Sequence, residues 1–354
     1  MTSHFSSSRL APLLGIRHPV VQGPFGGNLS TVSMVACVSN AGGLGSYGAH
    51  MLSPDEIGAL TANIRNATQS PFAINLWVDD EEPGGLHPTP EDFERWWPLF
   101  EPYYAELGVA KPACPPQTGQ HFADQVDALI EARPPVFSFV FGIPSRKVLD
   151  ACRVRGIRTI GAATTLAEAE ALDAAGVDAI VVTGMEAGGH RPSFLASAEA
   201  SLTGTFALIQ LVAPRVKAAV IAAGGIIDRR GIDAAVTLGA QGAQLGTAFL
   251  ACEESGATPE HRDALWSPAA RRTTLTRSFT GRLARGIDNR WVRELGSQRE
   301  FAPYPLQSWF MSGLRRATAG RTDLVSLWSG QIAPNLRHRT TAALMESLIG
   351  AGDA

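Results

Sequence analysis

Short apolar runs alternate with longer amphipathic segments along the chain between residues 19 and 246. Runs that are apolar on both faces are typical of strands in a parallel sheet covered by helices. The pattern predicts strands at eight places: 19–22, 43–47, 72–78, 135–141, 157–162, 178–183, 218–224 and 242–246.

The segments between these runs predict helices with recognisable ends. Residues 165–176 are rich in Ala, Leu and Glu and end at Gly176, a common residue after a helix. Residues 228–239 begin at Asp228, a favoured N-cap, and end at Gly239. Strands and helices that alternate in this way predict a (β/α)8 TIM barrel, which usually spans about 250 residues. A doubly wound sheet is the alternative fold.

Two parts of the chain break this alternation. Residues 79–108 begin acidic and rich in Pro and Gly, then become an aromatic amphipathic helix from about Glu91. We expect them to form an elaborated loop on the active-site face. After Thr247 no strand pattern remains. The predicted organisation is a frayed leader over 1–18, a barrel over 19–247 with an insertion at 79–108, and a helical cap over 248–354 that completes the same domain.

Composition narrows the choice of partner. The 354 residues carry a formal net charge of −3, so the chain lacks the basic footprint of a protein that binds nucleic acid or an anionic membrane. Its apolar runs are shorter than the roughly 18–20 residues of a membrane span, and the Ser-rich N-terminus lacks the apolar segment of a secretory signal. The four cysteines show no zinc-type spacing, so no metal is expected. We expect a cytoplasmic protein with a small-molecule partner, and whether it forms a homodimer stays open.

The stretch GLGSYG (43–48) matches the GxGxxG pattern of dinucleotide-binding folds. That pattern requires a strand before it and a helix directly after it. Here a helical pattern over 30–42 precedes it, and a strand pattern follows. We therefore interpret Gly42 and Gly43 as the end of that helix and reject a Rossmann fold.

Glycines at the ends of the last two predicted strands indicate a phosphate site. Gly224-Gly225 ends the seventh strand, and Gly246-Thr247 ends the eighth. In (β/α)8 enzymes the loops after these strands commonly hold a phosphate through backbone N–H groups, and glycine lets the backbone approach the anion. A structural role explains one such pair equally well, but two on adjacent strands favour a phosphate. A Walker lysine does not follow, which disfavours nucleoside triphosphate chemistry.

The stretch TGMEAGGHRPSF (183–194) follows the sixth predicted strand and places His190 over the same mouth. Gly188 and Gly189 would let the backbone approach a flat ligand. A neutral imidazole suits proton abstraction near pH 7, and we expect no helix or strand face that would bury this histidine. We therefore interpret His190 as a catalytic base. Glu186 either orients it or caps the loop.

Several stretches together resemble the nitronate monooxygenase family, formerly called 2-nitropropane dioxygenases: VVQGPFGG, FAINLW, GMEAGGHR and the block over 220–256. Members of this family are FMN-dependent (β/α)8 enzymes. The resemblance extends from about Pro19 to the stretches PYPLQ and SLWSGQ near the C-terminus. GMEAGGH alone is shared with the FMN-type enoyl-acyl-carrier-protein reductases.

The resemblance assigns roles to individual residues. His190 would take the proton alpha to a nitro group. The residues that it implies for FMN binding are Gln22, Gly23, Pro24, Phe25, Asn75, Thr183, Gly188, Gly189, Gly224, Gly225, Gln244, Gly246 and Thr247. The expected apolar substrate pocket draws on Phe25, Phe194 and Tyr304, with Trp77 as a further candidate.

The chain departs from the family at two positions. Some members have a glutamine where this chain has Thr183, and some have a lysine on the fifth strand at a position that matches Gly161. A positive group near the flavin ring stabilises the reduced anion, and without the lysine we look to backbone dipoles or Arg191 for that role.

The resemblance implies oxidation of alkyl nitronates, or of nitroalkanes deprotonated by His190, by O2 to carbonyl compounds and nitrite. The flavin would pass one electron from the nitronate to O2. The alternative enzyme is an FMN-dependent NAD(P)H reductase of enoyl thioesters or quinones. A non-catalytic flavin-binding barrel is the alternative from another class.

Overall fold

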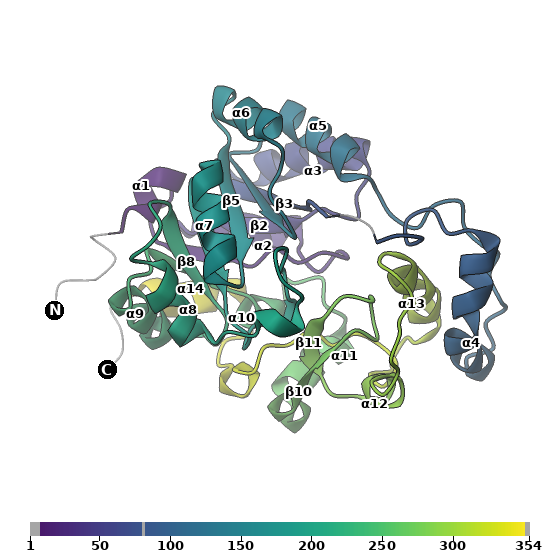
Figure 1. Cartoon of the computed structure of the whole chain (residues 1–354). Coiled ribbons are helices and arrows are strands. Elements are labelled where there is room, and N and C mark those ends of the chain that lie inside the picture. The colour runs from purple at the N-terminus through teal and green to yellow at the C-terminus, as the bar shows by residue number, and fades with distance from the viewer. Residues whose placement is uncertain (1–7, 80–81, 351–354) are drawn as a thin grey trace.

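Parallel strands close into a barrel, as predicted (Figure 1). In the computed structural model, which describes residues 8–79 and 82–350, the strand order around the 8-stranded sheet is β1-β9-β8-β6-β5-β4-β3-β2. The ring closes where Leu44 N donates to Val20 O and Gln22 N donates to Leu44 O, both at 2.9 Å. The strands are β1 Val20–Gln22, β2 Gly45–Gly48, β3 Phe72–Trp77, β4 Val136–Val140, β5 Arg158–Ala163, β6 Ala179–Thr183, β8 Ala219–Ala223 and β9 Gly242–Leu245. Each overlaps a predicted strand.

The helices of the outer layer begin at side-chain caps. Thr165 caps α7 in a capping box with Glu168, and Gly176 ends that helix in the left-handed region, as predicted. Asp228 caps α9, and Gly239 follows its end. The layer consists of α2 Val32–Asn40, α3 Pro54–Ala67, α5 Phe122–Ala132, α6 Arg146–Val154, α7 Leu166–Ala175, α8 Thr205–Val212, α9 Arg229–Thr237 and α14 Thr341–Ile349. The last of these packs against α2 and α9, so α14 completes the barrel layer rather than the cap.

The barrel interior is filled by small and branched side chains. Inward residues such as Val21, Ile160 and Ile221 form one apolar cluster together with the helix α1, Leu10–Leu14. Leu10 and Leu14 lie four residues apart, hence on the same helix face, and both are buried. The expectation of a frayed leader is therefore wrong for this segment. Residues 1–7 lie outside the described residues.

The insertion forms the predicted helix, α4, over Pro90–Glu106. It packs its aromatic face onto the C-terminal region and not onto the barrel helices, and Figure 1 shows it beside α13 (Leu306–Ala317). Phe93 and Phe100 of α4 contact Phe310 with ring centroids 5.1 and 4.3 Å apart.

The expectation that residues 248–354 contain no strand is wrong. β10 (Thr273–Thr276) and β11 (Ala284–Ile287) form an antiparallel pair, and β11 also pairs with β7 (Gly189–His190) from the barrel. TTLT and ARGI are too short and too polar to show strand periodicity, so their pairing partners decide their structure. The other elements outside the barrel layer are η2 Glu199–Ser201, α10 Thr247–Leu250, α11 Pro259–Trp266, η3 Pro268–Arg271, α12 Arg290–Leu295 and η4 Ala333–Asn335.

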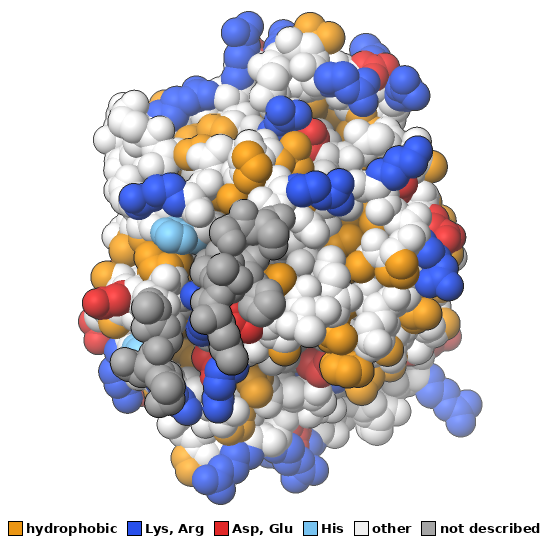
Figure 2. Space-filling view, turned by 90° about the vertical axis from the view of Figure 1, so that its left-hand side faces the viewer, with side chains coloured by type: hydrophobic (Ala, Val, Ile, Leu, Met, Phe, Trp, Pro, Cys, Tyr) orange, Lys and Arg blue, Asp and Glu red, His pale blue; other side chains and the backbone are white. Residues whose placement is uncertain are grey.

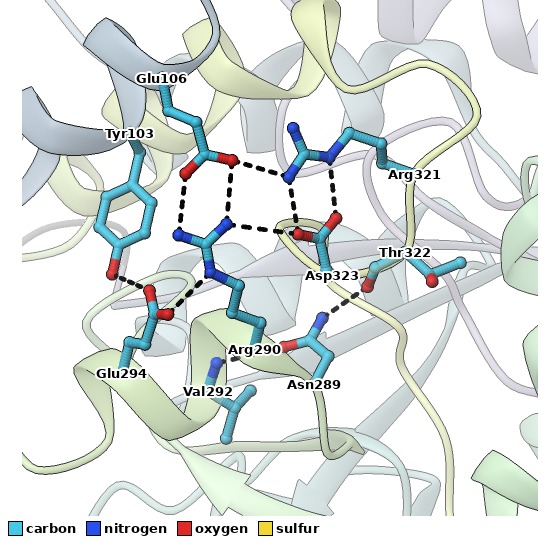
Figure 3. A network of polar contacts seen from close by, with 9 residues as sticks. All are labelled: Tyr103, Glu106, Asn289, Arg290, Val292, Glu294, Arg321, Thr322 and Asp323. Carbon is cyan, nitrogen blue, oxygen red and sulfur yellow. Dashed lines mark hydrogen bonds and ion pairs between the residues drawn. The ribbon is translucent and has the colours of Figure 1, made fainter.

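A network of charged side chains fastens α4 to this cap (Figure 3). We call it the charged clasp, and its members are Tyr103, Glu106, Arg290, Glu294, Arg321 and Asp323. The Glu106 carboxylate receives Arg290 Nη2 at 2.8 Å and Arg321 Nη2 at 2.9 Å. Arg290 also reaches Glu294 at 2.7 Å, and the Tyr103 hydroxyl donates to Glu294 at 2.8 Å.

The surface carries charges of both signs. On the face in Figure 2, Lys and Arg side chains are scattered among acidic and apolar ones rather than gathered into one patch. Among the helices of the described ranges, none has the length and apolar character needed to cross a membrane.

Candidate active site

The loops at the carboxyl ends of β1, β8 and β9 approach one another closely. Ala223 of β8 lies opposite Gln244 of β9, so the glycines that follow these two strands are neighbours. A Cβ placed on Gly23, just after β1, would lie 3.3 Å from the Gly246 Cα. The phosphate-site glycines predicted from the sequence thus stand beside the loop that follows the first strand.

Three glycines, one in the histidine loop and two after β8, adopt backbone conformations that other residues rarely take. Gly189, Gly224 and Gly225 have φ values of +76°, +101° and +69°. A Cβ on Gly189 would have no heavy atom of the described chain within 4 Å, beyond its chain neighbours, so the backbone there faces open space. A Cβ on Gly224 would lie 2.9 Å from the Thr205 hydroxyl. Glycine is therefore needed at position 189 for its backbone conformation. At position 224 a side chain would also clash with Thr205.

A segment of the cap closes over Thr247. Gly330 N donates to Thr247 Oγ1 at 2.9 Å, and Gln331 N donates to Glu186 O at 3.0 Å. The Thr247 oxygen is the acceptor in this bond, so its hydroxyl proton takes no part in it and can be donated to a ligand. Gly330 belongs to the SLWSGQ stretch, which contributed to the family resemblance but received no role from the sequence.

His190 lies on a strand, which corrects the expectation that no strand face would hold it. β7 pairs with β11, with His190 opposite Ala284 and Gly189 opposite Arg285. Arg285 reinforces this pairing by donating from Nε to Met185 O at 3.0 Å. The sequence could not show the pairing because β7 is only two residues long and its partner lies in the cap.

A hydrogen-bond chain links one nitrogen of His190 to the cap through Thr280, whose Oγ1 also accepts from Arg282 N at 3.3 Å. His190 Nε2 lies 2.9 Å from Thr280 Oγ1, and Thr280 Oγ1 lies 3.2 Å from the Arg282 carbonyl oxygen. A carbonyl oxygen only accepts, so a Thr280 hydroxyl that donates to it accepts from Nε2–H. In this arrangement Nδ1 holds the lone pair and is the basic atom.

Aromatic rings surround the His190 imidazole. The ring centroids of Trp77, Trp328 and Phe141 lie 4.9, 5.3 and 6.3 Å from it. His50 stacks on Trp77 at 4.0 Å with a 10° angle between the planes, and Tyr304 lies 5.1 Å from Trp77. We call these residues the aromatic cluster, with members His50, Trp77, Phe141, His190, Tyr304 and Trp328.

Desolvation lowers the pKa of both histidines of the cluster. Burial lowers the pKa of His190 to about 3, and His50 and Arg282 lower it further. Burial likewise lowers the pKa of His50 to about 3, with a smaller contribution from Arg282. His190 therefore carries an available lone pair throughout the physiological range.

Arg282 borders the aromatic cluster, and its charge is paired with two carboxylates, although its Nη2 makes no hydrogen bond within the described residues. Its side chain is 6% exposed, and it lies 3.3 Å from both the Asp79 and the Glu82 carboxylates. The guanidinium carbon sits 4.3 Å from the Tyr304 ring centroid and 4.6 Å from that of Phe141. Neither Arg282 nor Thr280 was predictable from the sequence, because both reach the site from the cap.

Glu186 and Arg191 both hold the histidine loop in place through hydrogen bonds to neighbouring backbone. The Glu186 carboxylate accepts from the Thr205 N–H at 3.0 Å and from its hydroxyl at 2.9 Å, so Glu186 caps α8. The buried Arg191 donates to the carbonyl oxygens of Thr183, Gly184 and Ser201 at 2.9, 2.7 and 2.6 Å. Arg191 therefore stabilises the histidine loop from its buried side.

Gly161 does not face the mouth of the barrel. A Cβ on Gly161 would lie 2.4 Å from Leu172 Cδ2 of α7 and 3.0 Å from the Phe139 ring. A side chain at this position would enter the layer between sheet and helices. The family lysine therefore has no counterpart at Gly161.

Two of the predicted flavin ligands bond to neighbouring strands. Gln22 is buried, and its Oε1 accepts from Ser46 N of β2 at 2.9 Å. Asn75 Nδ2 donates to Ser138 Oγ of β4 at 3.0 Å. Gln244 lies on β9 and is partly exposed.

The predicted pocket residues separate into different surroundings. Tyr304 joins the aromatic cluster. A Cβ on Gly246 would lie 3.8 Å from the Phe25 ring, which places Phe25 at the loops after β1 and β9. Phe194 packs on the core between strands and helices, and its N–H donates to Glu168 Oε1 at 2.6 Å. Among the described ring contacts, none joins Phe194 to the aromatic cluster.

The fold and the mouth define a TIM-barrel enzyme in which loops rich in glycine lie beside a partly buried histidine. The model of the nitronate monooxygenase family matches residues 7–350, and the chain belongs to this family of oxidoreductases. A probable nitronate monooxygenase of Staphylococcus saprophyticus is 36% identical over 348 residues, which cover 97% of each chain. One of Staphylococcus aureus is 37% identical over 331 residues, 92% of each.

Solved structures agree with this assignment. A nitroalkane oxidase from Streptomyces ansochromogenes superposes with a TM-score of 0.86 at 35% identity, over 96% of each chain. FabK from Thermotoga maritima gives a TM-score of 0.73 at 28% identity, over 97% of this chain and 94% of that one.

Proposed function

We propose that the protein is an FMN-dependent nitronate monooxygenase. It would oxidise alkyl nitronates, or nitroalkanes deprotonated by His190, to carbonyl compounds and nitrite with O2. The observation that carries the proposal is the neutral His190 imidazole, fixed by Thr280 beside a loop whose Gly189 backbone faces open space. Family membership and the likeness to a nitroalkane oxidase support the same reaction.

The residues at the mouth fit FMN. Gly224 and Gly225 after β8, with Gly246 and Thr247 after β9, would hold the phosphate through backbone N–H groups and the Thr247 hydroxyl. Gly188, Gly189 and the loop after β1 would lie against the ring. When bound, the flavin supplies electron transfer from the nitronate to O2. Overall, two nitronate ions and one O2 yield two carbonyl compounds and two nitrite ions.

His190 would move the proton. Its Nδ1 takes the proton alpha to the nitro group, and Nε2–H stays bonded to Thr280. The imidazolium then stands beside the nitronate anion, and this opposite charge raises the pKa of the imidazole. Because the pKa of His190 is lowered to about 3 before substrate binds, the base is weak. We therefore expect a preformed nitronate to be the better substrate.

The test is the variant His190→Asn, assayed with nitroethane and with preformed ethylnitronate. General bases contribute about 10²- to 10⁴-fold, so nitrite release from nitroethane should fall by at least 100-fold. Turnover of ethylnitronate should persist. Equal losses on both substrates would show that His190 does not act as the base.

FabK is the solved structure that bears on the reductase alternative. Its identity and TM-score to this chain are lower than those of the nitroalkane oxidase, so the reductase alternative has weaker support. Anaerobic mixing of the flavin-loaded protein with NADH or NADPH separates the two activities. Rapid bleaching of the flavin absorbance would favour the reductase. Unchanged absorbance, together with nitrite release from ethylnitronate in air, would favour the monooxygenase.

A further inference from the structure

We propose that the substrate is a nitronate with an uncharged apolar or aromatic tail, and that the site disfavours a nitronate that carries a carboxylate. This inference rests on the proposed function and specifies its substrate class. It assigns tail selection to the aromatic cluster and to the charge group formed by Arg282, Asp79 and Glu82.

The position of the base decides where the tail must lie. A carbon that gives its proton to His190 has to come within about 3 Å of an imidazole nitrogen. Trp77 and Trp328 have ring centroids 4.9 and 5.3 Å from the imidazole centroid, so they border the same space. The substituents on that carbon therefore lie close to these rings.

These rings suit an apolar or flat substituent. Trp77 is 8% exposed, with His50 stacked on it and Tyr304 tilted against it at 5.1 Å. Aromatic pairs add about 0.5–1.5 kcal/mol to the burial of apolar area. Phe141 extends the same surface, with its centroid 4.7 Å from that of Trp77.

The charges around the cluster oppose a second negative group. Arg282 is one positive charge that faces two negative ones, Asp79 and Glu82, each at 3.3 Å, so the group sums to −1. The two imidazoles of the cluster are neutral. In the described part of the cluster, a substrate carboxylate would thus face rings, neutral imidazoles and a cation already paired twice. Among the residues that the structure describes, Arg282 Nη2 makes no hydrogen bond of its own, but the Asp79 carboxylate lies 3.3 Å from it, so a substrate carboxylate would approach a group of net negative charge and not a free cation.

The first measurement compares nitronates as substrates in air, by nitrite release. We expect kcat/KM for the nitronate of phenylnitromethane to exceed that for propionate 3-nitronate at least ten-fold, with ethylnitronate in between. Equal values, or a preference for propionate 3-nitronate, would overturn the proposal.

A second measurement needs no turnover. Quenching of tryptophan fluorescence gives the Kd of phenylnitromethane and of 3-nitropropionate for the flavin-loaded protein. The proposal requires at least ten-fold tighter binding of phenylnitromethane, and equal binding would overturn it. If no nitronate releases nitrite, the proposed function fails, but the order of these two Kd values still decides the inference.

Glu82→Gln tests the electrostatic part. This substitution removes one negative charge. Tyr304 N donates to the Glu82 carboxylate at 3.1 Å, and the glutamine amide oxygen can still accept that hydrogen bond. The ratio of the two Kd values should shrink at least three-fold. The matched control is Glu300→Gln, which removes an equal charge from the ion pair with Arg95 and should leave the ratio unchanged. Equal ratios in both variants would contradict the role of Glu82.

Discussion

The chemistry of His190 depends on residues that lie far from it in the sequence. Thr280 holds Nε2 at 2.9 Å, and Trp77 and Trp328 enclose the ring. A histidine that met only solvent could use either nitrogen, whereas a Thr280 hydroxyl that accepts from Nε2–H leaves Nδ1 as the basic atom. Burial keeps that atom unprotonated.

Replacement of Thr280 tests this tautomer assignment. Thr280→Ala removes the partner of Nε2, and one hydrogen bond is worth about 0.5–1.5 kcal/mol. We expect kcat/KM for nitroethane to fall roughly three- to ten-fold. Thr280→Ser keeps the hydroxyl and should retain activity. Ethylnitronate, which needs no base, should be oxidised equally well by all three proteins, and a loss there would indicate a structural role instead.

The pH profile tests the protonation state of the base. A pKa lowered to about 3 leaves His190 neutral, and hence competent, at every pH above that value. We expect kcat/KM for nitroethane to show no acid limb from His190 between pH 8 and about pH 4. An acid limb near the ordinary histidine pKa of about 6.5 would contradict this protonation state if the wild-type enzyme showed it with nitroethane but not with ethylnitronate.

At the scale of elements, the histidine loop is held from three sides. β11 pairs with β7, Arg191 bonds three carbonyl oxygens behind the loop, and Gln331 N donates to Glu186 O. This framework leaves the Gly189 backbone facing open space at φ +76°. Such a rigid surface without side chains suits contact with a flat ring.

Two glycines offer a matched test of this surface. Gly189 and Gly156 have φ values of +76° and +73°, and a Cβ on either would have no heavy atom of the described chain within 4 Å. Alanine at each should cost about 1–2 kcal/mol from left-handed strain. Gly156 lies between α6 and β5, at the opposite end of the barrel, so only Gly189→Ala should also weaken FMN binding, at least ten-fold in Kd by flavin fluorescence. Equal FMN affinity in both variants would contradict a flavin against Gly189.

Periodicity predicted the barrel strands because each packs on both faces. The insertion helix and the end glycines were also predictable, since caps and aromatic spacing are local signals. β10 and β11 were not, because their short polar sequences become strands only through their partners. For the same reason the sequence indicated His190 but missed Thr280 and Arg282, whose contacts with the site depend on how the cap folds back.

At the scale of the whole molecule, the insertion supports the cap, and the cap supports the site. α4 packs Phe93 and Phe100 against Phe310, and the charged clasp joins it to Arg290 of α12 and to Arg321 (Figure 3). The same cap supplies Thr280, Arg282 and Trp328 to the surroundings of His190. We therefore propose that barrel, insertion and cap unfold as one domain.

The charged clasp makes this support dependent on pH. Hydrogen bonds from Arg290 and Arg321 lower the pKa of Glu106 to about 2. A carboxyl with a depressed folded pKa stabilises the protein above its unfolded pKa of about 4.3, and this contribution disappears as the pH falls towards 2. Glu106→Gln should therefore lower the Tm at pH 7 by about 1–2 °C, less in high salt, and the difference from wild type should vanish near pH 2. Glu101→Gln, an exposed change on the same helix, is the control for thermal unfolding followed by circular dichroism. A constant difference across this pH range, or an equal effect of Glu101→Gln, would show that the clasp does not hold the insertion to the cap.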